Sequence, residues 1–165
     1  MPQDSFDIHY TVNVSSLAGH LIDVSLHINL ASNEGHELSL PAWIPGSYMI
    51  RDFAKNLVEI SAKDKDGNAV ELRKLDKQTW KLAANSGPIE VCYRGTSVFL
   101  ALKSHRDIPC LVTLVKPQLA PCDNWRVATT LPLANTTEHH EFGEYQAKNY
   151  NELIDPPILL GNYDV

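Results

Sequence analysis

The segment of residues 41–53, here called the aromatic turn, carries the side chains best suited to contact a ligand or a partner. Trp43 and Tyr48 offer large aromatic faces. Between them, Pro45 and Gly46 suit the centre of a type II turn, because proline fixes its φ at about −65° and glycine accepts the positive φ that follows. The candidate substrate- or interdomain-contact residues are Trp43, Ile44, Pro45, Gly46, Ser47, Tyr48 and Arg51. We expect a rigid turn that either packs as a corner of the fold or presents these side chains.

Arg51 stands beside Asp52 near the end of the aromatic turn, and two roles are open for it. In one role, the guanidinium of Arg51 binds backbone carbonyls or a carboxylate and fixes the turn. In the other, it contacts an anion or a substrate beside Trp43 and Tyr48.

The sequence carries none of the common catalytic motifs. It has no H-E-x-x-H pair for zinc, no G-x-S-x-G nucleophile elbow, no P-loop and no dinucleotide fingerprint. His139, His140 and Glu141 form a metal-like cluster, but adjacent histidines in a polar loop point apart. We therefore assign no catalytic residue, no metal ligand and no cofactor to this chain.

Two further polar groups have structural interpretations. His9 and His27 take outward positions on neighbouring strands, where we expect a simple exposed pair rather than a metal site. Asp64, Asp66 and Asn68 have the spacing of a calcium loop but lack its remaining ligands, including the bidentate glutamate. We interpret them as a tight hairpin turn, for which the Asp-Gly step is a strong signal.

Apolar and polar residues alternate along much of the chain, which is the pattern of half-buried antiparallel strands. The clearest strands are residues 6–14 and 22–30, which a turn joins into a hairpin. Further strands are expected at residues 37–40, 57–62, 70–72, 79–82, 89–93, 97–102, 111–115 and 125–130. Trp80 and Trp125 fall inside strand patterns and are expected in the core. We predict an all-β antiparallel sandwich with little helix, residues 49–56 being the best short helix.

The length, net charge and cysteine content of the chain disfavour several classes of function. A chain of 165 residues can bury a single core without disulfides. Its net charge of −6 disfavours nucleic-acid binding, and it shows no apolar run of membrane-spanning length and no signal-peptide pattern. Cys92, Cys110 and Cys122 include no C-x-x-C pair, so we expect reduced thiols and a cytoplasmic location.

We divide the chain at residue 132. Residues 1–132 are predicted to form the β-sandwich domain. Residues 133–165 lose the strand periodicity and end in a segment rich in proline and apolar residues, which is typical of a final strand or linker leading toward another domain.

Four ordered motifs give the chain a family resemblance. They are residues 40–54 around the aromatic turn, a Gly-Thr-Ser motif at 95–100, a Trp-x-Val-x-Thr-x-Leu-Pro strand at 125–132 and an acidic, proline-containing exit at 150–158. The sequence resembles the N-terminal domain of glycyl aminopeptidase-type zinc metallopeptidases, bacterial and archaeal proteases that also carry a PDZ domain. One departure is that Tyr93-Arg94 runs directly into Gly95, where the family has a longer stretch.

The resemblance implies a saddle-like sandwich that precedes a thermolysin-like zinc domain. The zinc and the catalytic residues would belong to the parent protein and lie beyond Val165. The partners would be the catalytic domain of the same polypeptide and a peptide substrate, with the aromatic turn at their junction. We expect no nucleic-acid or membrane partner.

Two other functions are compatible with the residues. A stand-alone sandwich would bind glycan or peptide, using Trp43 and Tyr48 as a stacking platform. An assembly module would form homo-oligomers through exposed strand edges. A downstream H-E-x-x-H favours the protease domain, whereas a stop codon favours the binding module.

Overall fold

The computed structural model describes most of the chain. The described residues are 7–16, 21–39, 57–76, 79–85, 87–95, 100–116, 125–129, 131–134, 137, 141–154 and 158–161. The aromatic turn, the short helix expected at residues 49–56, His139, His140 and Cys122 lie outside these ranges.

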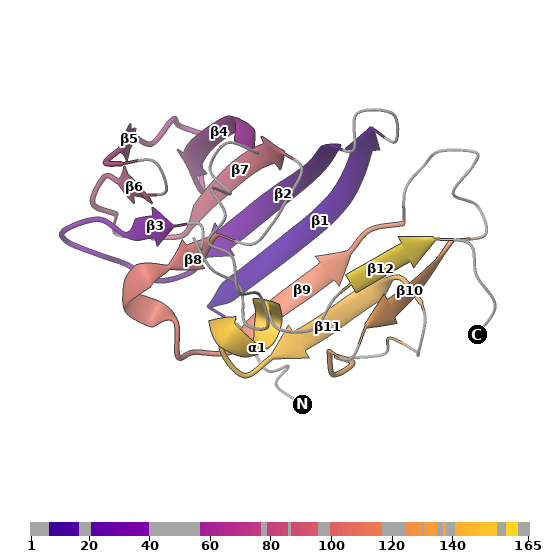
Figure 1. Ribbon diagram of the computed structural model, residues 1–165. Coiled ribbons are helices and arrows are strands. Elements are labelled where there is room, and N and C mark those ends of the chain that lie inside the picture. The colour runs from indigo at the N-terminus through magenta and orange to yellow at the C-terminus, as the bar shows by residue number, and fades with distance from the viewer. Residues whose placement is uncertain are drawn as a thin grey trace.

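The largest sheet contains six strands in the order β11-β9-β1-β2-β7-β4 (Figure 1). These strands are β1 (Ile8–Ser16), β2 (Leu21–Ile28), β4 (Leu57–Asp64), β7 (Ile89–Gly95), β9 (Cys110–Leu114) and β11 (Gly143–Ala147). β1 and β2 pair antiparallel, which confirms the predicted hairpin. The pairing of β1 with β9 is parallel, and the other strand pairs of this sheet are antiparallel.

Two smaller sheets lie toward opposite ends of the large one (Figure 1). The four-stranded sheet, ordered β5-β6-β3-β8, contains β3 (Glu37–Ser39), β5 (Leu72–Lys74), β6 (Thr79–Leu82) and β8 (Ala101–Leu102). β10 (Arg126–Thr129) and β12 (Ile158–Gly161) form an antiparallel pair. The helical pieces are η2 (Lys103–His105), a 3-10 helix, and α1 (Tyr150–Ile154). In the described part of the chain, no helix has the length and apolar content needed to cross a bilayer.

The core lies on one face of the six-stranded sheet, because alternate side chains of each strand point to the same face. Its residues from this sheet are Ile8, Tyr10, Val24, Leu26, Ile28, Ala62, Ile89, Val91, Tyr93, Cys110, Val112, Leu114, Tyr145 and Ala147. The same cluster contains Leu38, Trp80, Leu82 and Leu102 of the four-stranded sheet, together with Val127, Tyr150 and Leu153. The prediction of an all-β sandwich is therefore confirmed.

Two details differ from the sequence pattern. β11 and α1 follow residue 132, where no regular periodicity is visible, yet they place Tyr145, Tyr150 and Leu153 in the common core. Trp80 is buried as predicted, with 5% of its surface exposed. The prediction for Trp125 is wrong, since this residue is only half-buried and precedes the first paired residue of β10.

Candidate functional site

The aromatic turn lies outside the described residues, but both of its flanks are placed. Ser39 ends β3 in the four-stranded sheet, and Leu57 begins β4 at the edge of the six-stranded sheet. Residues 40–56, which hold the turn, therefore connect the two sheets. The contact roles predicted for Trp43, Ile44, Pro45, Gly46, Ser47, Tyr48 and Arg51 stay predictions.

Residues 96–99, the centre of the Gly-Thr-Ser motif, connect the same two sheets in the opposite direction. Gly95 ends β7 and Ala101 begins β8. The register pairs Leu57 with Gly95 and Ser39 with Ala101, so the ends of the two connections lie side by side at both sheets. We call these four paired residues the corner. Two motifs that are distant in sequence are thus anchored at one place.

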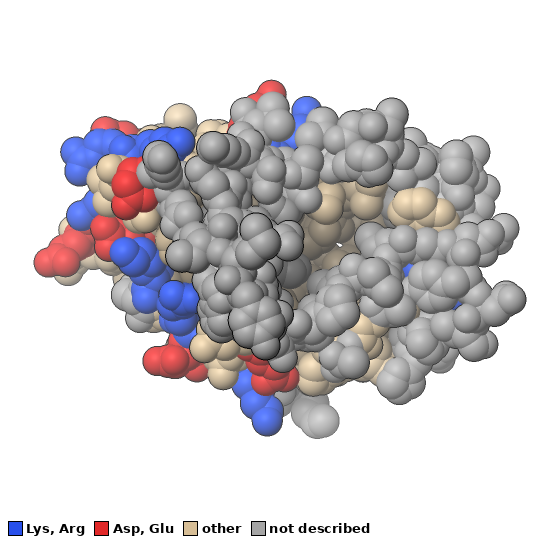
Figure 2. All heavy atoms as spheres, in the orientation of Figure 1, with Lys and Arg blue, Asp and Glu red and all other residues tan. Residues whose placement is uncertain are grey.

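Burial on the face of the four-stranded sheet that carries Ser39 increases toward the corner. Thr79 and Ala101, both paired with Ser39, are only 7% and 1% exposed. Arg73, at the other end of that face, is exposed. Figure 2 shows charged side chains of both signs gathered over the end of the molecule that holds β3, β5 and β6. The four-stranded sheet is therefore covered at the corner and solvated away from it.

Two buried tyrosine hydroxyls hold Leu100, which stands between the second connection and β8. The hydroxyl of Tyr10 donates a hydrogen bond to the carbonyl of Leu100. The amide of Leu100 donates to the hydroxyl of Tyr93 at 3.1 Å. Burial raises the pKa of both tyrosines well above the ordinary value of 10, so both stay neutral at physiological pH. The two hydroxyls thus satisfy both backbone polar groups of Leu100 inside the core.

Arg106 and Tyr150 extend this polar cluster toward α1. The amide of Tyr150 donates to the carbonyl of Arg106 at 2.9 Å, and the guanidinium lies 5.0 Å from the centroid of the tyrosine ring. Burial raises the pKa of the Cys110 thiol to about 12. Cys110 is therefore a packing group rather than a nucleophile at neutral pH.

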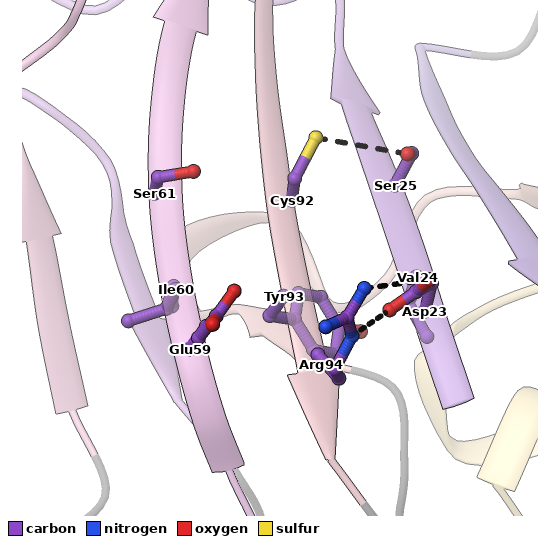
Figure 3. Close-up of a pocket in the computed structure, with 9 residues that line it drawn as sticks. All are labelled: Asp23, Val24, Ser25, Glu59, Ile60, Ser61, Cys92, Tyr93 and Arg94. Atoms are coloured by element: carbon purple, nitrogen blue, oxygen red, sulfur yellow. Dashed lines mark hydrogen bonds and ion pairs between the residues drawn. The ribbon is translucent and has the colours of Figure 1, made fainter. Parts of the chain in front are cut away.

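The opposite, polar face of the six-stranded sheet holds an open hollow of about 540 Å³ across β2, β7 and β4 (Figure 3). Asp23 and Arg94 form a bidentate pair there, with Nε–Oδ1 and Nη2–Oδ2 distances of 2.6 and 3.4 Å. The Cys92 sulfur lies 3.7 Å from the hydroxyl of Ser25. Because Arg94 directly precedes Gly95, the hollow adjoins the corner from the far side of the sheet. Asp23 and Arg94 pair with each other in this hollow, and we assign the hollow no ligand.

His9 and His27 face each other across β1 and β2, as predicted, with ring centroids 6.0 Å apart. His9 Nε2 lies 2.7 Å from the Thr113 hydroxyl, and His27 Nε2 lies 3.9 Å from a Glu90 carboxylate oxygen. Burial and the neighbouring His27 lower the pKa of His9, and Glu144 opposes this in part. His9 is half-buried, so the expectation of an exposed pair holds only for His27.

Metal ligands are not gathered in the described part of the chain. Among these residues, no three His, Cys, Asp or Glu side chains lie close enough to hold a metal ion. The carboxylate of Asp64 accepts hydrogen bonds from the amides of Asp66 and Asn68 at 2.9 and 3.0 Å, which confirms the hairpin-turn interpretation. The described residues therefore do not fit a zinc site.

A family model described as the Peptidase M61 N-terminal domain matches residues 9–96 and 93–162. The chain belongs to this family. The two matched ranges of the M61 domain meet at residues 93–96, which is the place where the sequence lacks the longer stretch noted for its relatives. The resemblance inferred from the four motifs is confirmed.

A solved structure supports the assignment. A crystal structure of an aminopeptidase N family protein from Idiomarina loihiensis is 35% identical over 93% of this M61 domain, with a TM-score of 0.86. The domain covers 29% of that protein, which is less than a third of its length. An M1 zinc metallopeptidase from Deinococcus radiodurans, solved with a Tyr-Ser-Ala substrate, is 12% identical with a TM-score of 0.43, covering 86% of this chain and 37% of that one. A search of curated proteins finds no match.

Tyr10 and Tyr93 are the residues of the corner region that sequence reasoning missed. Both take inward positions of alternating strands, where the sequence pattern predicts apolar packing and no hydrogen bond. A tyrosine at an inward position still has to find a hydrogen-bond partner for its hydroxyl, which is the signal that marks them.

Proposed function

We propose that this M61 domain is the non-catalytic N-terminal β-sandwich of a zinc-dependent, aminopeptidase-like metallopeptidase. In this proposal the two connections that begin and end at the corner pack against the catalytic domain of the same polypeptide and border its substrate cleft. Contacts to that domain, or to the amino end of a peptide substrate, come from Trp43, Ile44, Pro45, Gly46, Ser47, Tyr48 and Arg51. The family resemblance implies that the parent protein also carries a PDZ domain.

The observation that carries the proposal is the match of nearly the whole domain to less than a third of a longer aminopeptidase N family protein. The geometry of the corner adds support. Both connections that carry family motifs begin and end at paired residues, and the sheet beneath them is covered there. A corner anchored in this way suits a surface that must keep its shape against another domain.

We assign the chemistry of peptide cleavage to the catalytic domain of the proposed parent protein. In zinc peptidases the metal activates a bound water for attack on the peptide carbonyl. Since the described residues offer no ligand set, we propose that residues 1–165 bind no stoichiometric zinc. The domain would bind and orient the peptide and take no part in proton transfer.

Substitutions in the aromatic turn of the full-length protein test this role. Trp43→Ala and Arg51→Ala should raise KM for peptides with a free amino end roughly tenfold, with a smaller change in kcat, because they remove binding contacts and leave the chemistry intact. Arg73→Ala is the matched control, since Arg73 is exposed at the far end of the four-stranded sheet. Unchanged KM in both turn variants would contradict the proposed role.

The location and the assembly state are also proposals. Cys92 and Cys110 are free thiols, which supports a reducing compartment such as the cytoplasm. The edge strand β4 has an irregular register between Leu57 and Glu59 and an exposed charge at Lys63. Both features disfavour pairing at this edge, so a homo-oligomer would use another strand edge.

A further inference from the structure

The polar face of the six-stranded sheet carries its charges in two rows that run across β4, β7 and β2. The register places the first row, here called the lysine row, at Lys63, Glu90 and His27. It places the second row, here called the arginine row, at Glu59, Arg94 and Asp23. From β4 to β2 the lysine row therefore reads positive, negative, imidazole, whereas the arginine row reads negative, positive, negative. On each of these strands the two rows are opposite or complementary in character.

Ion pairs within each row hold these charges above their own strands. The Lys63 Nζ lies 3.8 Å from a Glu90 carboxylate oxygen, and the Arg94 Nε lies 2.6 Å from an Asp23 carboxylate oxygen. The side chains of Lys63 and Arg94 are still 50% and 42% exposed. Carboxylate and guanidinium groups have more acceptor and donor sites than one partner uses. Each row can therefore bind a second set of charges from outside the chain.

The row between the two charged rows consists of short side chains. Ser61, Cys92 and Ser25 occupy it, and they line the open hollow described above (Figure 3). Longer charged side chains flank this middle row on both sides. A flat partner can therefore reach the lysine row and the arginine row together without a clash at the centre.

We propose that this face binds the same face of a second copy of the chain and forms a two-fold symmetric homodimer. The symmetry axis lies between the two copies and runs parallel to the middle row. The lysine row of one copy then lies over the arginine row of the other. Lys63 faces Glu59 of the second copy, and Glu90 faces Arg94 of the second copy. Such an isologous interface forms each contact twice.

The alternation of charge favours a second copy as the partner. A partner must present negative, positive and negative groups at the spacing of neighbouring strands, and the arginine row presents that order. Facing sheets keep their strand directions within about 30°, a rotation that long side chains can follow. This assembly uses a sheet face and needs no free strand edge, and it does not depend on the proposed function.

The size of the face predicts a weak dimer. β1, β2, β7 and β4 are seven to nine residues long, so at a strand spacing of about 4.8 Å they present roughly 500 Å² per copy. An interface of this size is at the low end for specific complexes, where association is transient. Because its contacts are exposed ion pairs, added salt should weaken it.

Charge reversals at Glu59 and Lys63 test the proposal in the full-length protein. These residues lie four positions apart on β4, about 13 Å along the strand, so they cannot pair within one chain. Lys63→Glu and Glu59→Lys each set like charges against each other twice, and each variant alone should weaken dimerisation roughly tenfold or more. An equal mixture of the two variants should form a heterodimer, with an affinity within about threefold of the wild-type homodimer, because both contacts then join opposite charges. Sedimentation velocity over a range of concentrations measures all three.

Arg73→Glu is the matched control, because it reverses an exposed charge on the four-stranded sheet and should leave dimerisation unchanged. Mixing the two β4 variants does not alter the fold of either chain, so recovery in the mixture reports contact between copies. A wild-type protein that stays monomeric up to roughly 500 µM would overturn the proposal and leave this face solvated. A dimer that neither β4 variant weakens, or a mixture that forms no heterodimer, would show that copies associate through another surface.

Discussion

At the scale of the residue, side-chain contacts of this domain join parts of the chain that are far apart in the sequence. The inward direction of Tyr10 follows from the alternation of the first strand. The partner of its hydroxyl does not follow from this alternation, because Leu100 lies 90 positions along the chain, directly before β8 of the four-stranded sheet. The ion pair between Asp23 and Arg94 likewise joins residues that are distant in the sequence. They lie 71 positions apart, and only the register of β2 and β7 brings them together.

We predict that His9 makes the domain less stable as the pH falls below about 6.5. Burial first, and His27 second, hold the pKa of His9 below its ordinary value of 6.5. The unfolded chain takes up the proton at about pH 6.5, whereas the folded chain does so only at lower pH. The stability that neutral His9 contributes beside Thr113 is therefore full above pH 6.5 and is lost as the pH falls through the folded pKa.

His9→Gln should flatten the dependence of the urea midpoint on pH between about pH 5 and 7. The pKa of His9 can be followed directly by an NMR titration of its ring protons. A His9 pKa at or above the ordinary value would contradict the prediction.

At the scale of the element, strands with one buried and one polar face are predicted well. β1 and β2 lie where the alternation places them, and the Asp64 turn closes the hairpin after β4. β9 shows no such alternation, because Cys110, Leu111 and Val112 are all buried. Its parallel pairing with β1 depends on a long connection and could not be predicted from local pattern. β11 gives no clear strand pattern in the sequence, because its five residues begin at a glycine and include few apolar side chains.

Alanine substitutions at three glycines test how closely the turn before β3 packs against β6. Gly35 has a φ of +85°, and a Cβ added there would lie 1.9 Å from the carbonyl oxygen of Leu82 at the end of β6. We expect Gly35→Ala to cost about 3 kcal/mol or more in unfolding free energy. Gly67 has the same φ but open space around it, so Gly67→Ala should cost only about 1–2 kcal/mol.

Gly87→Ala is the control for this series, because φ there is not in the left-handed region and nothing lies within 4 Å of the added Cβ. Its effect should stay within about 0.5 kcal/mol. Urea unfolding of the three variants measures these differences. If Gly35→Ala lowers the unfolding free energy no more than Gly67→Ala does, the turn before β3 does not pack closely against β6.

At the scale of the whole molecule, the order of the four motifs was sufficient to predict the family. The anchoring of two of these motifs, residues 40–54 and 95–100, at one corner was not predictable, because it depends on the pairing of Ser39 with Ala101 and of Leu57 with Gly95. Sheet register of this kind arises from long-range packing and leaves no local signal. The aromatic turn lies outside the described residues, so its contact with substrate remains a proposal that the flanking geometry supports.

The most direct test of this proposal is photo-cross-linking of the full-length protein with a peptide that carries a photoreactive group at its amino end. The cross-linked residues are then identified by mass spectrometry. We predict cross-links to residues 40–56 or 96–99 that disappear when unlabelled peptide competes. Competable cross-links that fall elsewhere in the protein, with none in these two connections, would contradict the claim that the corner borders the cleft.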